Sequence, residues 1–204
     1  MISQDNFMAT YIELICKDFD ISISEQHYFK PHCAVFGKIR YRWGQFQNMH
    51  PKFPLSFGDF SCPTSEHLYQ ASRFPHRPDI QGAILQEESP LGAKGIAREF
   101  DKFTRDDWHD GIKILAMIEA ISHKIEQYQD IFHPLFEEAK NMPIVEFSNR
   151  DAFWGASPLH KGSPVMIGTN MLGQLWDLHK LSFLSKSKIV STTGYKIELF
   201  GAEI

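Results

Sequence analysis

The chain has 204 residues, of which 43% are hydrophobic and 23% are charged, which is the profile of one ordinary soluble globular domain. Its 21 basic and 25 acidic residues give a net charge of -4, which argues against tight binding to nucleic acid through bulk charge. Any contact with nucleic acid would therefore have to be local.

The cysteines and the N-terminal segment indicate the compartment. Cys16, Cys33 and Cys62 are odd in number and far apart, so they predict neither a disulfide framework nor a zinc site. Residues 1–20 carry acids among apolar residues without a basic flank, and no apolar run approaches the length of a membrane span. We therefore expect a cytoplasmic protein with reduced thiols and no membrane partner.

Few elements can be read in the first part of the chain. Residues 10–18 are compatible with a short helix, and residues 32–41 have the composition of a strand. Residues 38–43 alternate basic with apolar or aromatic side chains, so a strand there would place Lys38, Arg40 and Arg42 on one face. That face is either the solvent-exposed side of a half-buried strand or a small edge that binds an anion such as phosphate. In the second case the neighbouring aromatic rings could stack on a nucleobase.

A helix is predicted to begin at Thr64, whose side chain can cap it, with Glu66 in the first turn. Residues three and four apart share a helix face, and here that face would hold Glu66, Tyr69, Gln70 and Arg73. From the pattern alone, this stripe is either a solvated face with an ordinary attraction between Glu66 and Arg73, or a functional surface.

Four further helices are predicted in the middle of the chain, the first a short one that Asp79 would cap and that runs through Leu85 and Gln86. Ser89 is expected to cap a helix that begins at Pro90 and carries Lys94, which is more typical of a surface lysine than of a catalytic one. The clearest helical period covers residues 105–129, and another helix is expected over residues 131–140. The helical period of apolar residues over 105–129 indicates a helix with a structural role.

The last third of the chain contains a predicted strand, a loop and a helix. Residues 144–147 have strand composition, and the aromatic pair Phe153-Trp154 in the following loop covers either the core or a ligand. Gly168 precedes a helix that extends to about residue 183, and free amides at such a helix start can receive a phosphate. The residue pattern of the C-terminal tail, residues 188–204, alternates in the way typical of a β-hairpin, and it predicts a turn around Thr193-Gly194.

Taken in order, these segments are similar to the signatures of the NADAR (YbiA-like) family. The resemblance runs from about Phe36 to Leu181 and leaves residues 185–204 as a C-terminal extension. It is closest around residues 145–155, where the family has Val-Glu-x-Ser-x-x-Asp-x-Phe/Tyr-Trp-Gly. The other matching steps are Phe36 with Lys38, Gly44-Gln45-Phe46-Gln47-Asn48-Met49, Ser65-Glu66-His67, Tyr69-Gln70-Ala71, Arg73-Phe74, Ser89-Pro90 with Ala93-Lys94, Asp107-Trp108, and Gly168 with Asn170 and Leu172-Gly173.

Two positions depart from the family pattern. Gln47 stands where the family usually has serine, so one hydrogen-bonding contact near the site is expected to differ. Arg73 stands where members that act on metabolites often have lysine. The resemblance therefore favours ADP-ribosyl substrates over the pyrimidine intermediates of riboflavin synthesis.

The resemblance implies a mainly helical α+β single domain with a small β-sheet, over residues 1–204. It implies a hydrolase that cleaves N-glycosyl bonds, with ADP-ribosylated guanine, in nucleic acid or as a nucleotide, as the expected substrate and ADP-ribose as the product. The alternative substrates are small ribosylated metabolites such as riboflavin-pathway ribosylaminopyrimidines. A third hypothesis is a module that binds ADP-ribose or NAD without catalysis.

The candidate residues suit cleavage of a glycosidic bond. A carboxylic acid can protonate the leaving nitrogen, and Glu66 is the first choice for that role. Lys38, beside Arg40, is the candidate for attack on the anomeric carbon with formation of a Schiff base. Asp151 either binds ribose hydroxyls or orders Trp154.

The remaining candidates are substrate contacts. Trp154 or Tyr69 is expected to stack on the base, and Gly168 and Asn170 are expected to receive phosphate, with Asn48 and Arg73 completing the set. The histidines show no spacing typical of metal ligands, and neither a Ser-His-Asp arrangement nor a P-loop is present. We expect neither a metal nor a cofactor.

Overall fold

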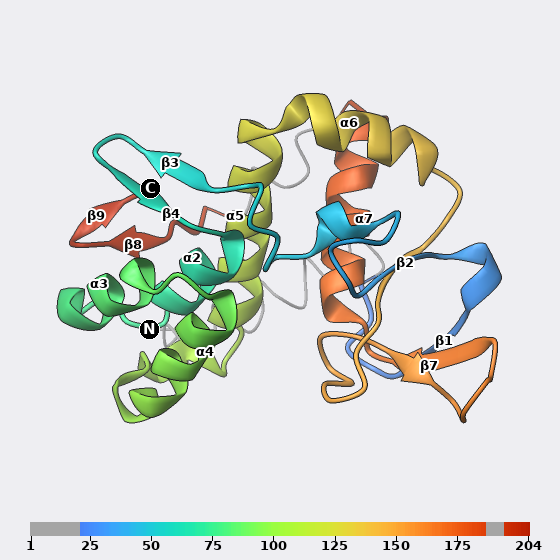
Figure 1. The fold of residues 1–204 in the computed structure, drawn as a ribbon, viewed down its shortest axis with the longest axis horizontal. Coiled ribbons are helices and arrows are strands. Elements are labelled where there is room, and N and C mark those ends of the chain that lie inside the picture. Colours follow the sequence, from blue (N-terminus) through green and yellow to red (C-terminus); the bar gives the residue numbers. More distant parts are fainter. Residues whose placement is uncertain (1–20, 187–193) are drawn as a thin grey trace, which may run out of the picture. The chain divides into compact units, whose positions relative to one another are not determined.

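The computed structural model describes residues 21–186 and 194–204 (Figure 1). Within these residues the chain forms two compact units. The first unit comprises residues 48–128 and 194–204, and the second comprises residues 21–47 and 129–186. The short helix expected over residues 10–18 lies outside the described residues.

The first unit is mainly helical. Its helix α2 (Ser65–Ala71) packs against the three helices α3 (Pro78–Gln86), α4 (Pro90–Glu99) and α5 (Ile112–Gln127). Short 3-10 turns at Asp101–Phe103 and Asp106–Trp108 join α4 to α5. Two antiparallel hairpins complete the unit: β3 (Leu55–Phe57) with β4 (Phe60–Cys62), and β8 (Glu198–Leu199) with β9 (Ala202–Glu203). Figure 1 shows α2, α3 and α4 as neighbouring short helices.

The predicted helix starts are confirmed at α2 and α4. Thr64 Oγ1 accepts a hydrogen bond from the His67 amide, and Ser89 Oγ accepts one from the Gly92 amide. The helix expected over residues 105–129 begins later, at Ile112. Gly111 precedes it with φ +122°, a left-handed conformation that interrupts the helical backbone and confines residues 106–108 to a 3-10 turn.

The second unit contains the small sheets that the family resemblance implied. Strand β2 (Ala34–Phe36) pairs in parallel with β5 (Ile144–Glu146). Strand β7 (Val165–Gly168) lies between β1 (Gln26–Phe29) and β6 (Ser157–Pro158) and is antiparallel to both. Helices α6 (Gln129–Glu138) and α7 (Met171–Leu184) cover an aromatic core, and 3-10 turns occur at Lys30–His32 and Gly44–Phe46. The core rings are Phe36, Phe46, Phe132, Phe136 and Trp176.

The mainly helical α+β fold is thus confirmed, but the strand expected over residues 38–43 is wrong. Residues 38–43 form a turn instead of a strand, because the chain folds back on itself: the Tyr41 amide donates to the Lys38 carbonyl at 3.0 Å. The end of the chain forms a hairpin that turns at Phe200 (φ 52°) and Gly201 (φ 82°). Two consecutive positive φ values match the twist of a two-residue hairpin loop. The turn expected around Thr193-Gly194 includes Thr193, which lies outside the described residues.

The described residues also show the state of two cysteines and whether any helix could cross a membrane. Cys33 and Cys62 are free, and burial raises the pKa of the Cys62 thiol to about 12. Cys16 lies outside the described residues. Within the described parts of the chain, every helix is too short or too polar to cross a bilayer.

Candidate active site

Glu66 lies in the first turn of α2, in the first unit. Its backbone amide donates to the Asn48 carbonyl at 3.1 Å, and Ser65 Oγ donates to the same carbonyl at 3.2 Å. The Thr64 cap therefore fixes the helix start, and Asn48 fixes the position of Glu66 on it. Only 6% of Glu66 is exposed.

The whole polar stripe of α2 is buried. Glu66, Tyr69, Gln70 and Arg73 are each less than 10% exposed. The expectation of a solvated face is wrong, because α4 and the 3-10 turns of residues 101–108 pack against α2. A buried carboxyl and a buried amide on one short helix, with a buried guanidinium just after its end, require internal partners.

Those partners form a chain of hydrogen bonds along α2. Gln70 Nε2 donates to Glu66 Oε1 at 2.8 Å, and Arg73 Nη1 donates to Gln70 Oε1 at 3.3 Å. The second terminal nitrogen of Arg73 donates to Thr104 Oγ1 at 2.9 Å and to the carboxylate of Asp101. The expected direct attraction between Glu66 and Arg73 is therefore replaced by a bridge through Gln70 and an ion pair with Asp101.

The electrostatic environment of Glu66 suits a proton donor. Burial raises the pKa of Glu66, while the nearby charge of Lys94, the hydrogen bond from Gln70 and the charge of Arg98 oppose that rise. A carboxyl group with a raised pKa keeps its proton to higher pH than a surface glutamate, so it can act as a general acid. Lys94, expected only on the surface, is half-buried on α4 and acts directly on this group.

Tyr69 and Asn48 are packed into the surroundings of Glu66. The Tyr69 ring centroid lies 5.2 Å from that of Trp108, and the Arg73 guanidinium lies 5.8 Å from the same Trp108 ring. Asn48 Nδ2 donates to the sulfur of Met117 at 2.9 Å. Asn48 thus joins the start of α2 to α5, a structural contact that sequence reasoning did not anticipate.

The other candidate residues belong to the second unit. Asp151 Oδ1 accepts the amides of Phe153 at 3.2 Å and Trp154 at 3.0 Å, which is the hydrogen bonding of an Asx turn. Of the two roles expected for Asp151, ordering of Trp154 has this direct geometric support. Binding of ribose hydroxyls by Asp151, and stacking of a base on Trp154, stay predictions.

Asn170 holds the start of α7 in an unusual way. It adopts a left-handed conformation with φ 54°; its Oδ1 accepts the Glu146 amide at 2.9 Å, and its Nδ2 donates to the Ile144 carbonyl at 3.0 Å. The amides of residues 169–172 donate to carbonyls of residues 152–155. A Cβ atom on Gly168 would lie 2.3 Å from the Gly155 carbonyl oxygen. Phosphate binding here stays a prediction, and it would require residues 152–155 to move.

Lys38 lies in the turn of residues 38–43 and is exposed. Its Nζ is 5.8 Å from the centroid of the Tyr41 ring, and the Arg40 guanidinium is 5.4 Å from the same centroid. Lys38 and Arg40 therefore share one aromatic neighbour. The nucleophilic role of Lys38 stays a prediction.

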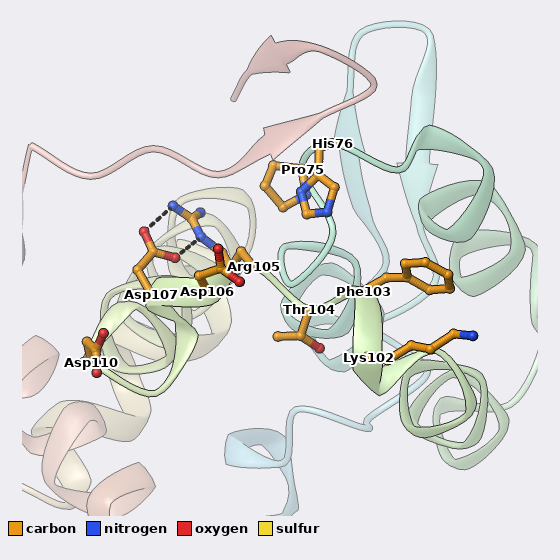
Figure 2. A pocket seen from close by; sticks show the side chains of 9 residues that line it. All are labelled: Pro75, His76, Lys102, Phe103, Thr104, Arg105, Asp106, Asp107 and Asp110. Atoms are coloured by element: carbon orange, nitrogen blue, oxygen red, sulfur yellow. Dashed lines mark hydrogen bonds and ion pairs between the residues drawn. The ribbon is translucent and has the colours of Figure 1, made fainter.

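A separate hollow of about 650 Å³ opens on the first unit (Figure 2). Figure 2 shows the Arg105 side chain bound to Asp107, with Asp106 next to this pair and Asp110 farther from Arg105. These acids make the hollow a poor receptor for a diphosphate. Glu66 is not among the lining residues, which are Pro75, His76, Lys102, Phe103, Thr104, Arg105, Asp106, Asp107 and Asp110.

Metal ligation finds no support in the described residues. No group of three or more His, Cys, Asp or Glu side chains within residues 21–186 and 194–204 could hold a metal ion. His67, for example, is buried with Nδ1 2.8 Å from Thr64 Oγ1 and Nε2 2.9 Å from the Glu87 carbonyl oxygen. Its role is to join α2 to the end of α3.

Comparison with known proteins gives relatives of two kinds. The chain is 35% identical over 146 residues to the chloroplastic riboflavin biosynthesis protein PYRR of Zea mays, covering 65% of this chain and 22% of that protein. It is 28% identical over 143 residues to a riboflavin biosynthesis protein of Vibrio vulnificus, covering 69% of this chain and 36% of that protein. The chain thus spans well under half the length of these two relatives.

The N-glycosidase YbiA of Escherichia coli is similar over nearly its full length. It is 29% identical over 150 residues, which cover 74% of this chain and 88% of YbiA. The NMR structure of YbiA superimposes with a TM-score of 0.64 at 26% identity, over 79% of this chain and 90% of that one.

The NADAR domain family matches residues 29–179, a range that takes in Glu66, the loop of residues 151–155 and the start of α7. The family resemblance inferred from short motifs is confirmed by this match and by the likeness to the YbiA structure. The chain belongs to the NADAR domain family.

Proposed function

We propose that this chain is an N-glycosidase in which Glu66 acts as the general acid. The observation that carries the proposal is the environment of Glu66: a buried carboxyl with a raised pKa, held by Gln70 and faced by Lys94. The similarity to YbiA, which is named an N-glycosidase, supports the same reaction class.

The reaction is hydrolysis of the bond between the anomeric carbon of ribose and a nitrogen of the base. As this bond breaks, positive charge develops on the sugar, and Glu66 transfers its proton to the departing nitrogen. A water oxygen then bonds to the anomeric carbon and gives up a proton, which restores the acid. The products are the free base and a ribose with a hydroxyl group at its anomeric carbon.

ADP-ribosylated guanine, in nucleic acid or as a nucleotide, is the substrate we propose first. The argument is the arginine at position 73, where members that act on metabolites often have lysine. Because arginine presents a planar fork of donors and lysine a single point charge, the two residues organise a site differently. The product is ADP-ribose, and we propose that the reaction takes place in the cytoplasm.

Ribosylated pyrimidine intermediates of riboflavin synthesis are the second candidate substrates. The observation in their favour is the similarity to two riboflavin biosynthesis proteins, one of Zea mays and one of Vibrio vulnificus. Those proteins are much longer than the matched region, so their names describe polypeptides with further parts. In both proposals the same acid serves, since each leaving group is a nitrogen.

A direct comparison of the two substrates tests the proposal. The native chain is incubated in parallel with ADP-ribosylated guanosine and with a phosphoribosylaminopyrimidine, and the released base and sugar are quantified. Release of ADP-ribose with no turnover of the pyrimidine supports the first substrate, and the reverse result supports the second. Tight binding of ADP-ribose without release from either substrate would favour the non-catalytic binding module.

A further inference from the structure

We propose that Arg73 and Gln70 are positioning residues, which together hold Glu66 so that its Oε2 atom carries the proton used in catalysis. This inference rests on the proposed function and names a role for two residues that do not themselves need to touch the substrate. The geometry that carries it is the chain of hydrogen bonds from Arg73 through Gln70 to Glu66.

The direction of this chain follows from the chemistry of its first member. A guanidinium group only donates hydrogen bonds, so the atom of Gln70 that faces Arg73 Nη1 must be the amide oxygen. The amide nitrogen of Gln70 then faces Glu66 and donates to its Oε1. Arg73 therefore determines which way the Gln70 amide points, and no exchange of its oxygen and nitrogen would satisfy both neighbours.

The consequence at Glu66 is a distinction between two otherwise equivalent oxygens. A protonated carboxyl has one carbonyl oxygen, the better acceptor, and one hydroxyl oxygen, the donor. Because Gln70 donates to Oε1, that atom takes the carbonyl role and the proton is placed on Oε2. A general acid with a fixed donor atom meets the leaving nitrogen in one orientation, which favours rapid transfer.

Arg73 is itself anchored on the side away from Glu66. Its Nη2 atom donates to Thr104 Oγ1 and pairs with Asp101, and its Cζ atom lies 5.8 Å from the Trp108 ring centroid. The Nε atom is buried without a hydrogen-bond partner among the described residues.

A lysine at position 73 could not reproduce this arrangement. A single ammonium has no planar fork with which to hold Gln70 on one side and both Thr104 and Asp101 on the other. We therefore expect Arg73→Lys to fold while losing the fixed orientation of Gln70.

The test uses Gln70→Leu, which keeps the volume but removes the donor to Glu66, together with Arg73→Lys. The control is Ser72→Ala, the buried residue that directly follows α2 and whose hydroxyl donates to the Tyr69 carbonyl. Cleavage of ADP-ribosylated guanosine is measured against pH, and the 13C NMR shift of the Glu66 side-chain carboxyl is titrated in the same proteins.

We expect Gln70→Leu to lower kcat at least tenfold with little change in KM, and to move the Glu66 titration and the alkaline limb of kcat to higher pH. The hydrogen bond from Gln70 favours the charged carboxylate, so its loss favours the acid. Arg73→Lys should shift both in the same direction, and Ser72→Ala should shift neither. An unchanged titration in Gln70→Leu would overturn the positioning role.

The two proposals fail in different ways. If Gln70→Leu shifts the titration of Glu66 but the native chain cleaves neither proposed substrate, the positioning role is supported and the proposal of an N-glycosidase is contradicted. If cleavage depends on Glu66 but Gln70→Leu changes neither the titration of Glu66 nor the alkaline limb of kcat, the N-glycosidase is supported and the positioning role is contradicted.

Discussion

Gln70 donates its amide nitrogen to Glu66 Oε1 across 2.8 Å, and both side chains are almost completely buried on the same face of α2. Residues four apart on a helix commonly meet in this way, but here the pair is enclosed by α4 and the turns that follow it. A buried carboxyl that keeps one well-defined partner is suited to hold and release a proton. The following predictions depend on that relationship and on the backbone contacts that support the site.

The pH dependence of activity should show an alkaline limb set by Glu66. Burial raises the pKa of Glu66, so the carboxyl is protonated and active below that pKa and is inactivated as the pH rises through it. Lys94 opposes this rise, so Lys94→Met should move the limb to higher pH. Lys113→Met, on α5, serves as the control and should leave the pH of the alkaline limb unchanged. A limb that moves to lower pH in Lys94→Met would contradict the assignment.

Glu66 should also affect stability with a defined sign. Its folded-state pKa is raised above the unfolded value, so the folded state binds the proton more tightly. The free energy of unfolding of the native chain should therefore fall, relative to Glu66→Gln, as the pH rises from about 4 through the raised pKa. Urea denaturation of both proteins at several pH values measures this difference. A difference that stays constant with pH would show that the carboxyl is not perturbed.

Substitution of Asn170 should destabilise the second unit. Asn170→Ala removes the hydrogen bonds to the Glu146 amide and the Ile144 carbonyl and places alanine at φ 54°. Two buried backbone groups lose their partners, so we expect a loss of about 2–5 kcal/mol in the free energy of unfolding. Asn149→Ala, in an exposed turn, should change it by less than about 0.5 kcal/mol. Equal effects of the two variants in chemical denaturation would count against this account.

Two glycine substitutions should have opposite effects. Gly168→Ala brings a Cβ atom to 2.3 Å from the Gly155 carbonyl oxygen and 2.8 Å from the Ala156 Cα, so the backbone must shift and the protein should be destabilised. Gly95→Ala lies inside α4 with open space around it, so it should stabilise by about 0.5–1 kcal/mol through its helix propensity. Thermal melting of both variants provides the comparison, and stabilisation by Gly168→Ala would be inconsistent with the contact.

The nucleophilic role predicted for Lys38 can be tested by trapping. If its amine forms a Schiff base with the opened ribose, borohydride added during turnover should leave a sugar adduct on the peptide that contains Lys38. Lys38→Arg should abolish the adduct, and Lys52→Arg, another exposed lysine, should retain it. Mass spectrometry that finds no adduct while turnover continues would assign the attack to water alone.

Much of the fold could be predicted because its signals are local. The capping side chains of Thr64 and Ser89 marked two helix starts, and the apolar period of residues 105–129 marked α5, although the helix begins only at Ile112. The parallel pairing of Ala34–Phe36 with Ile144–Glu146 could not be predicted, since those strands are far apart in sequence and each is only three residues long. The turn of residues 38–43 overrode an alternating pattern that favours a strand.

The shared stripe of candidate residues could be predicted from the sequence, but its environment could not. The stripe of Glu66, Tyr69, Gln70 and Arg73 was read correctly from helical spacing, but its burial depends on α4 and on the turns of residues 101–108, which no local pattern reveals. For the same reason the influence of Lys94 on Glu66 was missed. The bridging position of Gln70 between Glu66 and Arg73 also could not be predicted from the sequence, because it depends on where Asp101 and Thr104 hold Arg73.

The central claim is that Glu66 protonates the leaving nitrogen, and the most direct measurement varies the leaving group. Native chain, Glu66→Gln and the control Glu99→Gln, an exposed residue of α4, are compared on a substrate with a poor nitrogen leaving group and on an activated riboside that departs without protonation. We predict that Glu66→Gln loses about 10²–10⁴-fold of activity on the first substrate and far less on the second, while Glu99→Gln matches the native chain on both. Equal losses on both substrates would contradict the role of Glu66 as the acid.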